Sequence, residues 1–200
     1  LANIADGLTG LRLTNKRVTS KSHFIWSKIL IEFLYTKDQA GKVSGTITPS
    51  GAENYYNHYI YDEGFSYLQR GLGTPLVTLT SEARQSLAAH PFNYFTNNRL
   101  WAIHVGLSGQ LGGWNLQTKA TFSRNFGTYL TSGMPFRTPF GNITTPDPQN
   151  IFGKISQFST ILSVTKSLKN RTYLGVDFAG DLGGLLEPTA GISIKYGWKL

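Results

Sequence analysis

The chain has 200 residues, with 19 lysine and arginine against 11 aspartate and glutamate residues, a formal net charge of +8. It holds no cysteine, which excludes disulfide-stapled folds and cysteine-based metal or redox sites. Aromatic residues make up 13% of the chain, which argues against disorder. A membrane-spanning helix needs roughly 20 apolar residues, whereas the longest apolar run, residues 29–35, is interrupted by Glu32.

The N-terminal half predicts two strands followed by a long connection. A short strand is expected over residues 8–13 and a longer one over residues 25–36, where apolar and polar residues alternate with the period of a strand. Residues 38–95 then form a connection rich in tyrosine, proline and glycine. The apolar positions of the longer strand, opposite Lys28, Glu32 and Thr36, are Ile25, Ile29, Ile31, Phe33 and Tyr35.

The C-terminal half predicts five further strands. Alternation is clearest from Trp114 to Phe126, where the even positions are mostly apolar and the odd positions are all polar. Residues 128–153 form a second long polar connection, and residues 181–188 form a shorter one. The five strands are expected over residues 100–111, 114–126, 158–168, 172–178 and 192–200.

Two short turns keep the apolar faces of neighbouring strands in register. Gly112-Gly113 predicts a two-residue hairpin turn that pairs Leu111 with Trp114. Residues 169–171 predict a three-residue loop that pairs Leu168 with Thr172, with Asn170 or Arg171 in the left-handed region. In both hairpins the apolar side chains of the two strands then share a face.

Long strands joined alternately by short turns and long loops are typical of a transmembrane β-barrel. A soluble sandwich would bury the apolar face in a core, whereas a barrel turns it toward lipid and lines its lumen with polar side chains. The strand length favours the barrel, because a spanning strand needs about 9–11 residues. Aromatic residues near strand ends suit interfacial girdles: Trp26, Tyr35, Trp101, Trp114, Phe126, Phe158, Tyr196 and Trp198.

Arg124 stands on the face that is expected to contact lipid. Its place near the loop end of its strand would bring its guanidinium group to the lipid headgroups. Alternatively, a β-bulge at this point redirects the side chain.

The last strand suggests an orientation. Residues 192–200 alternate up to Leu200, and this resembles the C-terminal strand that bacterial assembly machinery reads on outer-membrane proteins, although most of those end on Phe or Trp. A periplasmic Leu200 places the turns near residues 15–20, 112 and 169 on the periplasmic side. The loops 38–95, 128–153 and 181–188 then lie outside the cell.

Seven strands are too few for a bacterial single-chain barrel, which normally has an even number of at least eight. The chain also opens on Leu1-Ala2-Asn3-Ile4, with neither an initiator methionine nor a signal-peptide pattern. We therefore expect residues 1–200 to be the C-terminal part of a single larger outer-membrane barrel.

No catalytic, cofactor or metal-binding motif occurs in the sequence, so neither an enzyme nor a cofactor is expected. Asp177, Asp181 and Glu187 gather around one loop and could bind a cation, but solvated loop carboxylates are the favoured interpretation. Lysine and arginine are scattered rather than clustered, so nucleic acid is not an expected partner. Metal-ligand spacing is absent among the four histidines, His23, His58, His90 and His104.

Residues 53–75 hold a dense mixture of aromatic and polar side chains. Such a mixture stacks on sugar rings while amide and guanidinium groups bond hydroxyls or carboxylates. The alternative is a loop folded into the lumen, with tyrosines that pack for structure. The residues of this mixture are Tyr55, Tyr56, Tyr59, Tyr61, Phe65 and Tyr67, interleaved with Asn54, Asn57, His58 and Arg70.

The same stretch resembles the outer-membrane capsule-assembly family Wzi, particularly its Bacteroidetes members. The likeness rests on Tyr56…Tyr59…Tyr61-x-x-Gly64-Phe65-x-Tyr67-x-x-Arg70-x-Leu72-Gly73-x-Pro75, followed by Asn97-Asn98-Arg99-Leu100. Gln69 stands where the family carries glycine before the arginine, and Leu72 replaces isoleucine. The resemblance implies a barrel of about eighteen strands that acts as a surface lectin and retains or organises capsular polysaccharide.

The sequence thus predicts an all-β, non-catalytic protein of the bacterial outer membrane that binds or organises surface polysaccharide. Its expected partners are that polysaccharide, outer-membrane lipid and lipopolysaccharide, for which a positive net charge is suited. The alternatives are an accessory barrel subunit with protein partners in an envelope complex, or a diffusion porin with a lumen lined by Lys28, Lys119 and Lys195. The candidate polysaccharide-binding residues are Tyr56, His58, Tyr61, Tyr67 and Arg70.

Overall fold

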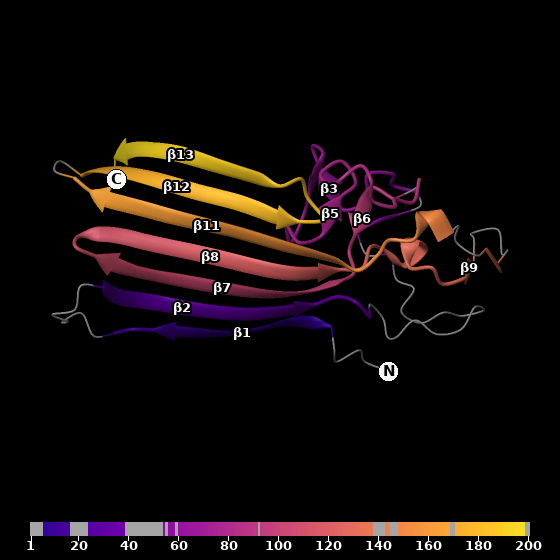
Figure 1. Cartoon of the computed structure of the whole chain (residues 1–200), viewed down its shortest axis with the longest axis horizontal. Helices are drawn as coiled ribbons and strands as arrows, with labels where there is room; N and C mark the ends of the chain where they lie inside the picture. Colours follow the sequence, from indigo (N-terminus) through magenta and orange to yellow (C-terminus); the bar gives the residue numbers. More distant parts are fainter. Residues whose placement is uncertain are drawn as a thin grey trace.

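The computed structural model describes residues 6–16, 24–38, 54, 56–58, 60–91, 93–137, 143–144, 148–168 and 171–198. Its main element is an antiparallel sheet of seven strands, which neighbour one another in chain order (Figure 1). In the described part of the chain, the sheet is not closed and has free edges at its first and last strands. The strands are β1 (Gly7–Thr14), β2 (Phe24–Tyr35), β7 (Leu100–Leu111), β8 (Trp114–Asn125), β11 (Ile155–Ser167), β12 (Thr172–Gly183) and β13 (Thr189–Trp198).

The described parts of the long connections hold short elements, whose strands pair in separate two-stranded sheets. Between β2 and β7 lie β3 (Ser66–Tyr67), β4 (Arg70–Gly71), β5 (Thr78–Leu79) and β6 (Phe95–Asn97). Between β8 and β11 lie the 3₁₀ turns η1 (Tyr129–Thr131) and η2 (Pro148–Asn150), with β9 (Phe136–Arg137) and β10 (Ile143–Thr144). Among the described residues, no helix has both the length and the apolar character needed to cross a membrane.

All seven predicted strands are confirmed, and the predicted hairpin geometry holds where it is described. Leu111 pairs with Trp114 across Gly112 and Gly113, which have φ values of 54° and 84°, the positive pair that a type I′ turn requires. The Leu168 N–H donates to the Thr172 carbonyl oxygen at 2.8 Å, and Arg171 has a φ of 58°. Leu200, residues 169–170 and most of the predicted turn near residues 15–20 lie outside the described residues.

The sheet has one polar and one apolar face, because residues paired directly across neighbouring strands point to the same side. A row of polar side chains crosses all seven strands apart from a glycine in β1; it runs Gly10, Glu32, His104, Thr121, Ser159, Asp181 and Thr189. The opposite face carries rows of mostly apolar side chains; one row, apolar apart from Thr118, runs Leu13, Ile29, Leu107, Thr118, Leu162, Phe178 and Ile192. We call these the polar face and the apolar face.

The predicted position of Ile25 on the apolar face is wrong, because β2 contains a bulge. The register with β7 shifts between Trp26 and Lys28, so Ser27 is the extra residue. Trp26 therefore pairs with Gly109 on the apolar face, while Ile25 pairs with a residue of the polar face. A two-residue period continued through a bulge assigns every residue beyond it to the wrong side.

The loops that carry the chain between strands gather at one end of the sheet, opposite the short turns (Figure 1). Part of the first long connection folds into a small body that we call the cap, formed by residues 54, 56–58, 60–91 and 93–98. Its core consists of Val77, Leu79 and Phe95, which are at most 4% exposed, with Tyr56 and Tyr94 packed against them. The cap covers the loop end of the polar face, since Pro75 and Leu76 line one cavity together with Thr121 of β8.

Buried asparagines attach the cap to the strands. Asn97 is fully buried and its amide nitrogen donates to the Asn125 side-chain oxygen at 3.0 Å. The Asn97 side-chain oxygen accepts from the Gly127 N–H at 3.1 Å, and the Asn125 amide donates to Ser123 at 3.0 Å. Because each buried polar group needs a partner, this chain of bonds fixes where β6 meets the end of β8.

A second set of amides ties the beginning of the cap to its end. The Asn57 side chain bonds both the N–H and the carbonyl oxygen of Phe95, at 2.8 and 3.0 Å. Asn54 donates to Asn93 at 3.0 Å, and Asn93 donates to Thr128 in the second long connection at 3.0 Å. The cap is thereby held to both the strand ends and the neighbouring loop.

Candidate functional site: a polar cavity beneath the cap

A cavity of about 390 Å³ lies between the cap and the polar face. Its volume falls in the range of about 300–1,000 Å³ that is usual for small-ligand sites. The floor is formed by Thr121, Ser123, Gln157, Ser159, Asp181 and Thr189, and the roof and rim by Pro75, Leu76, Thr78, Glu82, Leu185, Leu186 and Glu187.

The strand pairing brings the floor residues together. Thr121, Ser159, Asp181 and Thr189 are directly opposite one another on β8, β11, β12 and β13. Ser123 and Gln157 form the next pair toward the loop end. Hydroxyl, amide and carboxylate groups thus converge from four strands, although their sequence positions span almost 70 residues.

Asp181 is at the centre of a hydrogen-bonded group in this floor. Its Oδ1 accepts from the Ser159 hydroxyl at 2.5 Å, and its Oδ2 accepts from the Thr189 hydroxyl at 3.4 Å. In the same polar row, Thr121 shares a 2.7 Å hydrogen bond with His104 Nδ1. These bonds hold the side chains in defined orientations from which they can meet a polar ligand.

Gln157 connects the floor with the loop between β12 and β13. Its side chain is 3% exposed, and its Oε1 accepts from the N–H groups of Leu185 and Leu186, both at 3.3 Å. Its Nε2 donor is buried with no hydrogen-bond partner. A buried amide with one unused donor is uncommon in native structures, and here it belongs to a cavity wall.

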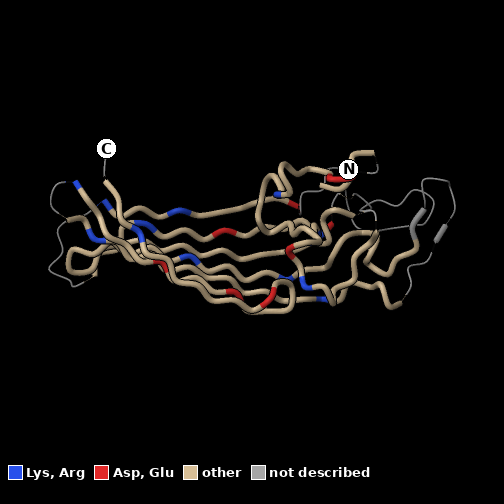
Figure 2. The backbone as a smooth tube through the Cα atoms, turned by 90° about the horizontal axis from the view of Figure 1, so that it is seen from above, with Lys and Arg blue, Asp and Glu red and all other residues tan. Residues whose placement is uncertain are grey.

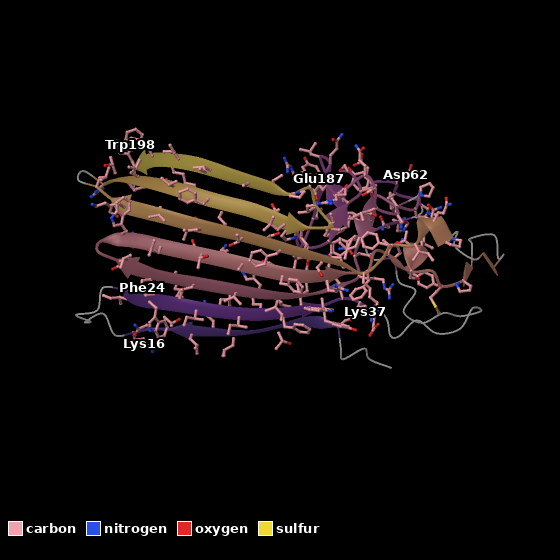
Figure 3. The ribbon with its side chains drawn as sticks, in the orientation of Figure 1. Lys16, Phe24, Lys37, Asp62, Glu187 and Trp198 are labelled. Atoms are coloured by element: carbon pink, nitrogen blue, oxygen red, sulfur yellow. The ribbon has the colours of Figure 1, made fainter. Side chains whose placement is uncertain are left out.

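Arg84 fixes the rim of the cavity by clamping this loop to the cap. Its Nη2 donates to the Gly183 carbonyl oxygen at 2.7 Å and its Nε to the Leu186 carbonyl oxygen at 3.0 Å. The Arg84 N–H donates to the Leu185 carbonyl oxygen at 2.9 Å. The Arg84 guanidinium group also lies 3.7 Å from the carboxylate of Glu187. Figure 3 labels Glu187 beside the cap.

The cavity is acidic although the chain is basic. Glu82, Asp181 and Glu187 contribute carboxylates, and no lysine or arginine is among the lining residues. Apolar contact comes from Pro75, Leu76, Leu185 and Leu186. A ligand would therefore meet hydrogen-bonding groups on one side and aliphatic groups on another, in a negative potential.

Several lysine and arginine residues lie at the end of the sheet with the short turns, and others are spread along the strands and at the cap end, as the blue segments of Figure 2 show. The predicted lumen lysines, Lys28, Lys119 and Lys195, all belong to the polar face by their strand pairing. Lys195 forms an ion pair with Asp177, which is 8% exposed. Asp177 stands two rows away from Asp181 on the polar face. The three carboxylates of the predicted loop cluster, those of Asp177, Asp181 and Glu187, therefore do not form one group.

Among the predicted site residues, Tyr56 is built into the cap core. Its ring centroid lies 5.6 Å from that of Phe65 and 5.5 Å from that of Phe95. A Cβ at Gly73 would lie 3.0 Å from the Tyr56 hydroxyl, and one at Gly64 only 2.0 Å from the Tyr56 carbonyl oxygen. The two glycines of the sequence pattern thus allow the chain to pass close to Tyr56.

His58 organises the turn that follows it. Its Nδ1 lies 3.1 Å from the Ile60 nitrogen and 3.3 Å from the Tyr61 nitrogen, accepting from both N–H groups. Its ring centroid lies 4.9 Å from that of Tyr61. The histidine thus supports the Tyr61 backbone at the outer end of the cap.

Tyr61, Tyr67 and Arg70 are exposed to solvent, as His58 is. The tyrosines are 69% and 66% exposed. Tyr67 pairs with Arg70 across the hairpin formed by β3 and β4, so these two side chains lie side by side. We call Tyr61, Tyr67 and Arg70 the cap tip. Tyr55 and Tyr59 lie outside the described residues.

A buried arginine balances charges where β7 begins. Arg99 is 7% exposed, and its Nε donates to the Lys37 carbonyl oxygen at 2.9 Å. Burial lowers the pKa of Arg99, while the nearby Asp38 and Asp6 act in the opposite direction. Burial also raises the pKa of Asp6, against the effect of the Asp38 N–H that donates to it. We assign this group to anchoring the strand ends.

The cavity residues were not predicted as a site. Ser159 and Gln157 carry no motif, and only the parity of their positions indicated that they belong to the polar side of a strand. Asp181 was noticed for its charge, but it was placed in a loop, whereas β12 extends past it to Gly183. In the described part of the chain, no group of three or more metal-ligating side chains occurs.

Comparisons of the chain with family models, with curated proteins and with solved structures found no match.

Proposed function

We propose that the chain is part of an outer-membrane β-barrel that binds or organises surface polysaccharide without catalysing a reaction. The observation that carries the proposal is the pair of unlike faces of the sheet. Large apolar side chains on one face are exposed, among them Ile31 at 48%, Phe178 at 45% and Ile194 at 76%. Contiguous exposed apolar surface of this extent indicates an apolar environment such as lipid.

The dimensions of the apolar face support a membrane setting. Trp101 and Leu111 mark its two ends on β7, ten positions apart, which corresponds to about 34 Å along a strand. A barrel strand tilted by about 35–45° would then cover about 24–28 Å of membrane, close to the apolar band of outer-membrane barrels.

Aromatic side chains border the apolar face at both ends. Tyr35 and Trp101 lie together in the row at the loop end. Phe24 and Trp198 lie at the short-turn end, toward opposite edges of the sheet (Figure 3). Such borders are typical of barrel strands at the two membrane interfaces.

The position of Arg124 fits the same arrangement. It pairs with Trp101 in the row at the loop end, and its Nη1 donates to the Ser156 hydroxyl at 2.7 Å. No register shift redirects it, so its guanidinium group stands at the edge of the apolar band. There it would meet the headgroups of outer-membrane lipid or lipopolysaccharide.

The free edges of the sheet require further strands in this setting. Unpaired backbone groups cannot face lipid, so a membrane sheet must close. We therefore propose that β1 and β13 pair with strands outside the described sheet. The short turns would be periplasmic and the cap extracellular.

Polysaccharide contact is proposed at the cap tip. Tyr61 and Tyr67 offer exposed aromatic faces, and Arg70 beside Tyr67 offers donors for hydroxyl or carboxylate groups. Tyr56 and His58 would act indirectly, because the first packs in the cap core and the second supports the Tyr61 backbone. The resemblance to the Wzi family gives capsular polysaccharide as the ligand.

The test uses the full-length protein reconstituted in lipid vesicles and a titration with purified surface polysaccharide. Tyr61→Ala and Tyr67→Ala are each expected to weaken binding about tenfold, as loss of a stacking contact worth about 1–1.5 kcal/mol would do. Met134→Ala, an exposed side chain in the other long loop, serves as the control and should bind like the wild type. Absence of binding by the wild-type protein would refute the proposal.

Conductance in planar bilayers distinguishes the main alternative, a diffusion porin. The cap covers part of the polar face, so we expect no steady open channel. Stable channels of fixed conductance would favour the porin with its lumen lysines.

A further inference from the structure

We infer that the cavity beneath the cap is a second carbohydrate site, which takes a neutral or amino-substituted sugar residue and rejects a uronic acid. The inference rests on the proposed function, because it assigns a subsite to a glycan-binding barrel. It concerns residues distinct from the cap tip, on different elements of the fold.

The composition of the cavity wall favours a sugar over other small molecules. Ser159, Asp181 and Thr189 form one hydrogen-bonded group, and each of these side chains can both position and bond a ligand hydroxyl. Leu185 and Leu186 offer aliphatic surface for the C–H side of a pyranose ring. A flat aromatic or a purely apolar ligand would displace water from the remaining hydrogen-bonding positions of the floor without replacing its bonds, at a cost of about 1–3 kcal/mol per group.

The charge of the wall decides between classes of sugar. Glu82, Asp181 and Glu187 give the cavity three carboxylates, of which Glu187 has Arg84 nearby at 3.7 Å. A hexuronate would add a negative charge to this set, whereas a hexosamine would add a positive one. The net charge of the chain is positive, but no lysine or arginine is among the residues that line the cavity.

The cavity is built by contacts that do not depend on a ligand. Arg84 donates to three carbonyl oxygens where β12 ends and the loop to β13 begins. Gln157 of the floor accepts from two N–H groups of the same loop. A site whose walls are fixed in advance loses less conformational freedom on binding. The Gln157 Nε2 group, which has no hydrogen-bond partner, adds a donor to the cavity wall.

The experiment titrates the full-length protein in detergent micelles with glucosamine, glucose and glucuronate, observed by saturation-transfer NMR. We expect glucosamine to bind tightest and glucuronate weakest. Asp181→Asn should remove the advantage of glucosamine over glucose. Ser159→Ala should weaken both sugars about tenfold, the effect of losing one hydrogen bond within a charged group.

Ser163→Ala is the matched control, because Ser163 stands on the same strand and the same face but outside the cavity lining. Thermal unfolding of each variant checks that it is folded, and Thr189→Val provides a second way to remove a floor hydroxyl. Equal binding of glucuronate and glucosamine would overturn the inference, as would wild-type affinity in the Ser159, Thr189 and Asp181 variants.

The polysaccharide titration separates this inference from the proposed function. If the cap-tip variants lose polysaccharide binding while the cavity variants do not change sugar binding, the function stands and the cavity site is refuted. If the wild-type protein binds neither polysaccharide nor sugars, both proposals fail.

Discussion

Two residues of the cap that carry side chains adopt a left-handed backbone conformation, which a Cβ atom disfavours. Leu68 and Gln69 connect β3 to β4 with φ values of 48° and 61°. A two-residue hairpin turn of this type requires positive φ at both positions, and a side chain there costs roughly 1–2 kcal/mol per residue. Glycine would adopt this conformation at either position without that cost.

Gln69→Gly should therefore stabilise the β3–β4 hairpin by up to about 1 kcal/mol, since glycine adopts positive φ without strain. Hydrogen exchange at the amides of residues 66–71 measures the change. Gln110→Gly, in the extended backbone of β7, is the control and should destabilise the sheet. Faster exchange in the Gln69 variant would contradict this account of the turn.

At the scale of elements, the alternating pattern predicted the strands well, because a sheet with two unlike faces imprints its period directly on the sequence. The need to keep the apolar faces of the two strands on one side also predicted a left-handed residue at Asn170 or Arg171, and Arg171 has a positive φ. The pattern predicted the wrong face for Ile25, because the bulge at Ser27 interrupts the two-residue period. It also ended β12 too early, because Ala179 and Gly180 do not show which face they occupy.

The cap and its cavity were beyond such prediction. Their contacts join Asn57 to Phe95 and Arg84 to Gly183, and no local period records which distant segments will meet. The glycines and tyrosines of residues 53–75 were recognised as a pattern, but their packing around Tyr56 depends on Phe95. The sequence therefore predicted the loop but not which of its side chains pack in the cap core.

The cap should loosen in acid because of His90. Burial lowers the pKa of His90 from its ordinary 6.5, so the open cap binds a proton more readily than the packed one. The stabilisation is complete above pH 6.5 and is lost as the pH falls through the lowered pKa. Limited proteolysis within residues 80–91 should accelerate between pH 7.5 and pH 5.

His90→Gln is the control for this effect, since glutamine does not titrate in that range. The variant should show a smaller difference in cleavage rate between the two pH values. An identical acid response in both proteins would assign the loosening to the carboxylates instead.

At the scale of the whole molecule, the seven strands form a sheet with exposed apolar side chains on one face and polar side chains on the other. Val105 lies near the middle of the apolar face, midway between the rows of Trp101 and Leu111. Gln117 lies on the polar face of the neighbouring strand and is exposed. The two positions therefore probe the two faces at similar depth.

Val105→Lys should destabilise the protein in lipid vesicles by about 2–4 kcal/mol, the cost of a lysine at the bilayer midplane. Gln117→Lys should change the unfolding free energy by less than about 1 kcal/mol, because its side chain would remain exposed on the polar face. Denaturant unfolding of the full-length protein in vesicles measures both. Equal tolerance of the two lysines would indicate that the apolar face does not contact lipid.

The order of the seven strands has a consequence for how such a sheet can change over evolution. Each strand bonds only the strands next to it in the chain, so an antiparallel hairpin is a self-contained unit of the sheet. Duplication or loss of one hairpin would change the width of the sheet while leaving the remaining pairs in register. The cap couples β7 and β8 to the loop before β13, so the hairpins it spans are the ones that must be inherited together.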